Sequence, residues 1–188
     1  MARMAIAHVA SLALPVTAAP ARHVTFPELV REHQNEVFGV ALRMLGDRDA
    51  AMDVTSTVFL KAYRAFGRYD QRRPARHWLI RIAVNESISA GRSRTRERAR
   101  LAPADDALTV ADRAPTPDVE TVAREERAQV RQAVAGLEEP YRTVTVLRYF
   151  SGLTVDEIAQ VTGRPSSTVG VQLLRARGIL RKAMGGTA

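Results

Sequence analysis

The chain has 188 residues, no cysteine, and 28 Lys and Arg against 20 Asp and Glu, which gives a formal net charge of +8. The missing cysteine excludes disulfides, thiol catalysis and thiolate metal sites, and the 4 scattered histidines lack the spacing of a metal centre. No phosphate-binding glycine loop is present and no nucleophile–base pair can be recognised, so we expect neither an enzyme nor a cofactor. The positive charge favours an anionic partner, either nucleic acid or a membrane surface.

Residues 1–23 begin with a mildly apolar run that has two interpretations. The run from Met4 to Val16 resembles a weak secretory signal. It contains His8 and Pro15 and is too short to span a bilayer. We interpret residues 1–23 as a disordered N-terminal extension, and we expect a cytoplasmic protein with no stable membrane insertion.

Two helices are predicted next, and the charge of the chain changes from negative to positive near the end of the second. Apolar residues recur at helical spacing over 26–45, the pair Gly46–Asp47 breaks the pattern, and a second helix is predicted over 49–66. Its inward residues are expected to be Val54, Val58, Phe59, Ala62 and Phe66. The segment 24–59 is acidic, whereas 60–81 carries seven Lys and Arg against Asp70 alone.

Aromatic residues are interleaved with the basic ones in this second stretch. Tyr63, Phe66, Tyr69 and the only tryptophan, Trp78, lie among arginines. Aromatic side chains in a basic groove hold single-stranded nucleic acid by base stacking. The alternative is that Trp78 only packs the core beneath a solvated basic face. A third helix is predicted from about Arg76 to Ser93.

The apolar periodicity is lost after this helix and then resumes. Residues 91–101 hold five arginines, and 102–120 hold three prolines and five acidic residues, which indicates a flexible linker. Helical spacing resumes from Val119 to Leu137, and a further helix is predicted from Pro140 to Phe150, with Phe150 inward. We therefore predict an all-α protein in which two small domains, 24–96 and 119–184, are joined by a linker at 97–118.

The segment from Leu153 to Arg177 has the pattern of a helix-turn-helix. Thr154 and Glu157 form a capping box, Gly163 supplies the turn, and a second helix follows with Val169, Leu173 and Leu174 at helical spacing. Such a second helix lies in the major groove of DNA, with its N-terminal residues at base edges. An ordinary helical hairpin is the alternative, but the basic residues that follow favour DNA: Arg175, Arg177, Arg181 and Lys182.

Both halves of the chain together resemble the extracytoplasmic-function group of bacterial sigma factors. ALRMLGDRDAAMDV, FLKAYRAFGRYD and RRPARHWLIRIAVN resemble sigma region 2, and AGLEEPYRTVTVLRYFSGLTVDEIA with STVGVQLLRAR resembles region 4. The resemblance implies a transcription initiation factor that binds core RNA polymerase, recognises the −35 element as duplex and melts the −10 element. The resemblance is also compatible with an anti-sigma factor as a further partner.

The resemblance also implies site residues. Tyr69 and Asn85 match the positions that frame a flipped −10 base, a step that costs about a few kcal/mol of unstacking. Arg73, Arg76 and Arg81 would hold phosphates and Trp78 would support the local fold. Polymerase binding is expected at Asp49 and Asp53. The −35 element would be read by residues at the helix-turn-helix: Thr154, Ser166, Ser167, Thr168, Gln172 and Arg175.

The chain departs from the family at both surfaces. Met52, Ser56 and Thr57 replace the usual acidic residue and Gln-Glu pair beside Asp53, which would weaken the polymerase contact. Gly170-Val171-Gln172 replaces the usual Lys/Arg-Ser-Arg of the recognition helix, so duplex affinity should depend less steeply on salt. Two alternatives to a sigma factor therefore stay open: a helix-turn-helix regulator independent of sigma function, and an interaction protein that retains only the sigma fold.

Overall fold

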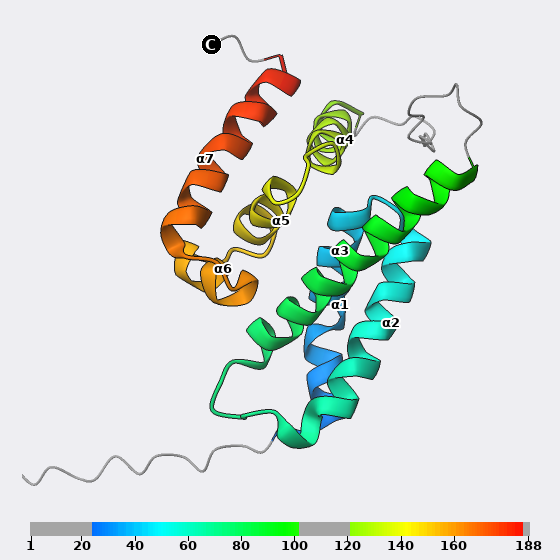
Figure 1. The fold of residues 1–188 in the computed structure, drawn as a ribbon, viewed down its shortest axis with the longest axis vertical. Helices are drawn as coiled ribbons and strands as arrows, with labels where there is room; N and C mark the ends of the chain where they lie inside the picture. Colours follow the sequence, from blue (N-terminus) through cyan, green and yellow to red (C-terminus); the bar gives the residue numbers. More distant parts are fainter. Residues whose placement is uncertain (1–23, 102–120, 186–188) are drawn as a thin grey trace, which may run out of the picture.

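The computed structural model describes residues 24–101 and 121–185, and no strand occurs within these two ranges. The predicted extension at 1–23 and the predicted linker residues 102–118 lie outside them. The described residues form two groups of helices, α1 to α3 and α4 to α7, which lie side by side (Figure 1). Within the described ranges, no helix combines the length and the hydropathy that a membrane-spanning segment needs.

The first two helices have the predicted positions, and the residues at their ends explain why. α1 (Phe26–Leu45) begins with a capping box between Thr25 and Glu28 and ends at Gly46, whose φ of 68° is the left-handed conformation that glycine adopts most easily. α2 (Arg48–Ala65) begins at Asp47, whose side chain accepts a hydrogen bond from the Ala50 N–H at 2.8 Å. Of the predicted inward residues, Val54, Val58 and Ala62 are buried, whereas Phe59 and Phe66 are half-buried.

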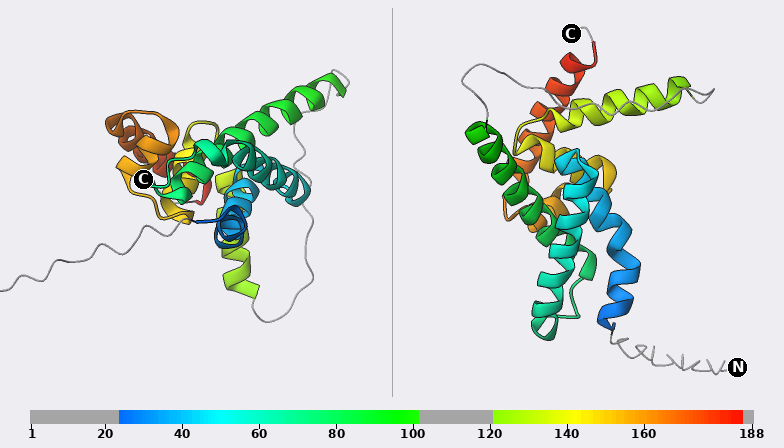
Figure 2. Two further views of the ribbon diagram at one scale, coloured as in Figure 1. Left: turned by 90° about the horizontal axis from the view of Figure 1, so that it is seen from below. Right: turned by 90° about the vertical axis from the view of Figure 1, so that its right-hand side faces the viewer.

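A short 3₁₀ turn, η1 (Phe66–Arg68), leads to α3 (Ala75–Leu101). The predicted end of this helix at Ser93 is wrong, since α3 continues to Leu101 and includes the first residues of the predicted linker. Its last turns extend beyond the neighbouring helices, so they need no apolar face (Figure 2). Arg, Glu and Ala are intrinsically good helix formers, and arginines near a helix C-terminus interact favourably with its dipole. Arg94 also bonds to Asp47 at 2.8 Å.

The second group begins with α4 (Thr121–Ala135) and α5 (Tyr141–Thr145), followed by five residues of π-helical backbone, η2 (Val146–Phe150). Val144, Val146 and Leu147 are fully buried. The prediction that Phe150 points inward is wrong, because its side chain is exposed. Instead, the guanidinium of Arg43 lies 4.7 Å from the centre of its ring, an arrangement that favours a cation.

The last two helices are α6 (Val155–Thr162) and α7 (Ser166–Ala183). The predicted capping box of Thr154 and Glu157 is present, and Gly163 between the helices has a φ of 69°. Val169 and Leu173 are buried against the rest of this group. Leu174, which was predicted to share their apolar face, is 65% exposed, because a residue one position beyond Leu173 is turned by about 100° around the helix axis.

The two groups of helices share one continuous hydrophobic core that extends from Leu29 to Leu173. α6 packs against α3, and α1 contacts both α4 and η2. The Arg142 guanidinium donates to the Met44 carbonyl at 2.9 Å and ties α5 to the end of α1. The described parts of the two predicted domains are therefore packed together, and we name the contact between α3 and α6 the α3–α6 interface.

Candidate nucleic-acid interface

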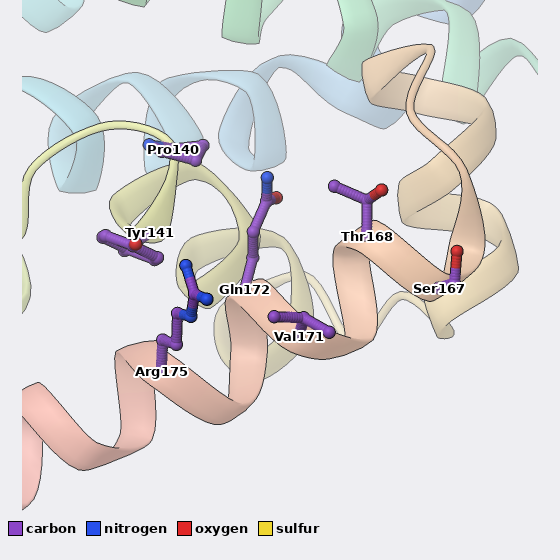
Figure 3. A pocket seen from close by; sticks show the side chains of 7 residues that line it. All are labelled: Pro140, Tyr141, Ser167, Thr168, Val171, Gln172 and Arg175. Atoms are coloured by element: carbon purple, nitrogen blue, oxygen red, sulfur yellow. The ribbon is translucent and has the colours of Figure 1, made fainter.

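The outward face of α7 brings together most of the residues predicted to read duplex DNA. Val169, Leu173 and Ala176 are the buried residues of this helix, so its opposite face is free. A hollow of about 330 Å³ lies beside α7 and is lined by Pro140, Tyr141, Ser167, Thr168, Val171, Gln172 and Arg175. The side chains of Gln172 and Arg175 extend from α7 toward Pro140 and Tyr141 (Figure 3).

Two further residues of the predicted set lie at the starts of the helices. The Ser166 hydroxyl donates to Asp156 at 2.6 Å, which fastens the start of α7 to the first turn of α6. Thr154 caps α6, and its backbone N–H donates to Glu157 at 2.8 Å. This hydrogen bond is the largest cause of the lowered pKa of Glu157, followed by the Thr154 hydroxyl. Both residues thus fix the geometry of the helix-turn-helix.

All of the charged side chains on α7 are positive. α7 contains no Asp or Glu in its sequence from Ser166 to Ala183, whereas it contains Arg175, Arg177, Arg181 and Lys182. All four of these side chains are exposed. A helix face of this kind suits the phosphates and base edges of a duplex.

Tyr69 and Trp78 form a stacked pair beside η1. Their ring centres are 4.5 Å apart and their planes are inclined by 15°. The Tyr69 hydroxyl donates to the Arg73 carbonyl, and burial raises the pKa of the phenol above its usual value, so the phenol remains a donor at neutral pH. Both rings are half-buried. Tyr69 therefore supports the loop that leads into α3 in addition to any contact with a base.

Arg81 and Asn85 lie four residues apart on α3, and both are exposed. Arg81 donates to the carbonyls of Val161, at 3.2 Å, and Gln160, both in α6. Asn85 lies one turn farther along the helix, so the structure brings it close to Arg81. The exposed Arg73 lies before the start of α3, 3.7 Å from Asp70.

Arg76, which was predicted to hold a phosphate, is bound within the protein. Its guanidinium forms a bidentate pair with Glu36 of α1, with Nε and Nη2 at 3.0 and 2.6 Å from Oε1, and donates to the Ser151 carbonyl as well. One third of this side chain is exposed. In this arrangement Arg76 joins α1, α3 and the second group of helices.

His77 also bridges the α3–α6 interface. Its Nε2 lies 3.3 Å from a carboxylate oxygen of Glu157 in α6. Because Glu157 belongs to the capping box of α6, α3 helps to position the start of the helix-turn-helix. The first turns of α3 therefore contact the second group through His77, Arg76 and Arg81.

The predicted polymerase contacts lie on the outward face of α2. Asp49 and Asp53 are exposed and one turn apart. Three large apolar side chains on this helix are exposed as well: Met52 by 52%, Leu60 by 50% and Tyr63 by 65%. Steps of three or four residues link the residues of one face: Asp49, Met52, Asp53, Ser56, Leu60 and Tyr63. The surface is an apolar stripe with two carboxylates at its N-terminal end.

The hydroxyls that replace the family's polar residues on α2 are bonded within the helix. Ser56 donates to the Met52 carbonyl at 3.0 Å, and Thr57 donates to the Asp53 carbonyl at 2.9 Å. Such back-bonding to the residue four positions earlier removes the hydroxyl proton from contact with a partner. Asp49 and Asp53 are left as the carboxylates of this face.

Sequence reasoning missed several residues that the structure places at these surfaces. Leu60, Val171 and Leu174 are apolar, and apolar residues in a helical pattern are normally assigned to the core. A helical wheel centred on Val169 and Leu173 would have placed Val171 outward. His77 carried no sequence signal, since its partner Glu157 is 80 positions away in the chain.

Comparison with known proteins matches both groups of helices to one family. Residues 29–97 match the model of Sigma-70 region 2 and residues 127–180 match that of Sigma-70 region 4. The chain is 33% identical over 168 residues to the RNA polymerase sigma-H factor of Pseudomonas aeruginosa, covering 85% of this chain and 86% of that protein. It is 30% identical over 167 residues to the ECF RNA polymerase sigma factor SigW of Bacillus subtilis, covering 85% and 88%.

Solved structures show the same fold. CnrH in complex with the cytosolic domain of CnrY is 27% identical, with a TM-score of 0.60 over 87% of this chain and 89% of that one. The sigma factor RpoE of Bartonella quintana in complex with the anti-sigma factor NepR is 19% identical, with a TM-score of 0.65 over 87% and 98%. The chain belongs to the extracytoplasmic-function group of the sigma-70 family of RNA polymerase sigma factors.

Proposed function

We propose that the chain acts as an initiation factor through three separate surfaces, one for core RNA polymerase and two for promoter DNA. The observation that carries this proposal is the outward face of α7, which is free, holds no carboxylate and follows a capped helix and a left-handed glycine. In a helix-turn-helix this is the face that enters the major groove. Ser167, Thr168, Gln172 and Arg175 would contact the −35 element.

The −10 element would be melted along the first half of α3. Asn85 is exposed about three turns into this helix and lies two turns beyond Trp78, whose ring stacks on Tyr69. A base that leaves the duplex needs an aromatic or polar pocket to replace the stacking it loses. Arg81 uses its Nε and Nη2 groups to bind the carbonyls of Val161 and Gln160, so all of its donors would be free for a phosphate only after it releases them. Separation of the α3–α6 interface would therefore favour promoter melting.

The outward face of α2 would bind the polymerase. Asp49 and Asp53 give it negative charge, while Met52, Leu60 and Tyr63 supply apolar area, and interfaces combine such an apolar centre with a polar rim. The Ser56 and Thr57 hydroxyls are occupied within the helix. The carboxylates and the apolar side chains would thus carry the contact. The chain would act in the cytoplasm, where its polymerase partner works.

An anti-sigma factor is a further proposed partner. The solved complexes of CnrH with CnrY and of RpoE with NepR each pair a protein of this fold with a second protein, described for NepR as an anti-sigma factor. Because the present chain shares their fold, we propose that it binds a partner of the same kind.

Reconstituted transcription tests the proposal. The full chain and core polymerase are mixed with a library of genomic fragments, and we expect transcripts that start at defined positions only when both proteins are present. Asp53→Arg should reduce binding to core polymerase in a titration, because it reverses one of the two charges on the α2 face. A helix-turn-helix regulator independent of sigma function would bind duplexes without supporting transcription.

The melting site is tested by Asn85→Ala. Asn85 is exposed, so its replacement should leave the melting temperature unchanged, whereas Tyr69 also stacks on Trp78 and would confound stability with function. We expect permanganate reactivity of the melted thymines to fall by at least several-fold, while binding of the duplex in a gel shift stays within about twofold. Normal strand opening by the folded variant would contradict the proposed site.

A further inference from the structure

Two exposed aliphatic side chains occupy the centre of the outward face of α7. Val171 is 48% exposed and Leu174 is 65% exposed. They are three residues apart, so they lie next to each other on one face of the helix. This face is opposite the buried residues Val169, Leu173 and Ala176. Neither aliphatic side chain is therefore needed for the core.

The surroundings of this pair indicate a nucleic-acid partner. Ser167 precedes Val171 by one turn and Arg175 follows it by one turn, and both are exposed. Val171 lines the same hollow as Ser167, Thr168, Gln172 and Arg175 (Figure 3). With no carboxylate on α7 and four basic side chains beyond Leu174, the face is complementary to a polyanion.

Only one group in the major groove suits an aliphatic side chain. The edges of adenine, guanine and cytosine present hydrogen-bond donors and acceptors there, whereas thymine adds a methyl group at C5. An aliphatic side chain facing any other base would bury a polar edge without a hydrogen bond. The pair would thus reject bases that lack the methyl group and accept thymine.

We propose that Val171 and Leu174 select the −35 duplex by contact with thymine methyl groups. This inference rests on the proposed function of α7 as the helix that enters the major groove, and it names the chemical feature that the helix recognises. Gln172 and Arg175 beside the pair supply the hydrogen bonds for neighbouring purines. The preferred −35 element should carry thymine, on either strand, opposite these two residues.

The experiment removes the methyl group and nothing else. Duplexes preferred by the chain with core polymerase are first selected from a randomised pool, and each thymine of the −35 element is then replaced by deoxyuridine. Uracil has the hydrogen-bonding edge of thymine without its methyl group. We expect about a fourfold loss of affinity for each contacted methyl group, which corresponds to one buried methylene-sized group.

Variants of the chain connect this loss to the two side chains. Val171→Ala and Leu174→Ala should bind thymine and deoxyuridine duplexes with equal affinity at the position each residue contacts. Ile179→Ala is the matched control, since Ile179 is an exposed aliphatic residue later on the same helix, and it should retain the full deoxyuridine effect. All three residues are exposed, and thermal melting of each variant checks that the fold is intact.

The outcomes separate this inference from the proposed function. Specific duplex binding that is unchanged by deoxyuridine at every position would overturn the methyl contact and leave −35 recognition standing. Selection of duplexes without any shared sequence would overturn both. An equal loss of the deoxyuridine effect in Ile179→Ala would show that the effect does not depend on this face.

Discussion

At the scale of single residues, Asp47 combines two structural roles. It caps α2 through the Ala50 N–H and pairs with Arg94 of α3 at 2.8 Å. These contacts lower the pKa of the Asp47 carboxyl, and the hydrogen bond from Ala50 is the larger cause. A carboxyl with a lowered pKa stabilises the fold at pH values above its pKa in the unfolded chain, about 3.9. This stabilisation is lost as the pH falls through the lowered value.

Two substitutions separate the cap from the charge. Asp47→Ala removes both and should lower the free energy of unfolding at pH 7 by about 1 kcal/mol, the usual cost of losing an N-cap. Asp47→Asn keeps the cap and should lose less. The difference between the native chain and Asp47→Asn should shrink as the pH is lowered from 5 toward 2. Denaturant titrations at several pH values measure this, and a constant difference would show that Asp47 does not contribute through its charge.

At the scale of one element, α7 is weakened in its second turn by Gly170. A helical glycine costs about 1 kcal/mol relative to alanine, and the space around Gly170 is open, since a Cβ there would meet no atom within 4 Å. The residue lies beside Val171 in the half of the helix that is proposed to enter the groove. Its side-chain position is thus available to DNA.

Gly170→Lys and Gly170→Gln test what this position does. Both replacements restore helix propensity and should stabilise the chain by about 0.5–1 kcal/mol. Only lysine adds a phosphate contact, so only Gly170→Lys should steepen the dependence of log affinity on log salt concentration, by about 0.9. Duplex binding measured at four or more salt concentrations gives the slopes. An equal slope for both variants would place this position away from the phosphates.

Local structure was largely predictable at this scale, and particular residues show why. The bounds of α1 and the capping box of α6 follow from short-range signals, Gly46 and the pair Thr154–Glu157. The length of α3 was mispredicted because a loss of apolar spacing was interpreted as the end of the helix. Its last turns lie outside the core, where intrinsic propensity decides.

Contacts between the two groups of helices could not be predicted in the same way. Arg76 and Arg81 bind backbone carbonyls far away in the chain. Every residue offers the same backbone carbonyl, whatever its side chain, so the sequence does not indicate which one is bound. The positive charge of these arginines therefore predicted an anionic ligand and did not reveal the partner within the protein. The outward position of Leu174 was missed for a different reason, since apolar residues are assigned to the core by default.

At the scale of the whole molecule, the α3–α6 interface adds a few polar contacts to the hydrophobic core that the two groups of helices share. His77 and Glu157 form a half-buried contact across it, with the nitrogen and the oxygen 3.3 Å apart. His77→Glu would place two carboxylates against each other. We expect this variant to shift the ratio of closed to open molecules about two- to fivefold, corresponding to about 0.5–1 kcal/mol for a charge pair near the surface. His77→Gln keeps a neutral donor and is the control.

The chain is convenient for this measurement because it contains no cysteine. Cysteines introduced at the exposed positions Glu97 of α3 and Lys182 of α7 would carry two fluorophores. Energy transfer between them should fall in His77→Glu and remain at the native level in His77→Gln. Unchanged transfer in a folded His77→Glu variant would show that the ion pair does not hold the interface closed.

The carbonyls that Arg76 and Arg81 contact have a consequence for promoter binding. The carbonyl oxygens of Ser151, Gln160 and Val161 offer these guanidinium groups the same kind of acceptor that phosphate oxygens would. On the proposed role of these arginines as phosphate ligands, the second group of helices would compete with the nucleic-acid backbone for them. Because this competitor belongs to the same chain, dilution would not remove it, and the apparent dissociation constant for the −10 strand would equal the intrinsic one divided by the open fraction. Any partner that holds the two groups of helices apart would therefore tighten the binding of the −10 strand without touching the DNA.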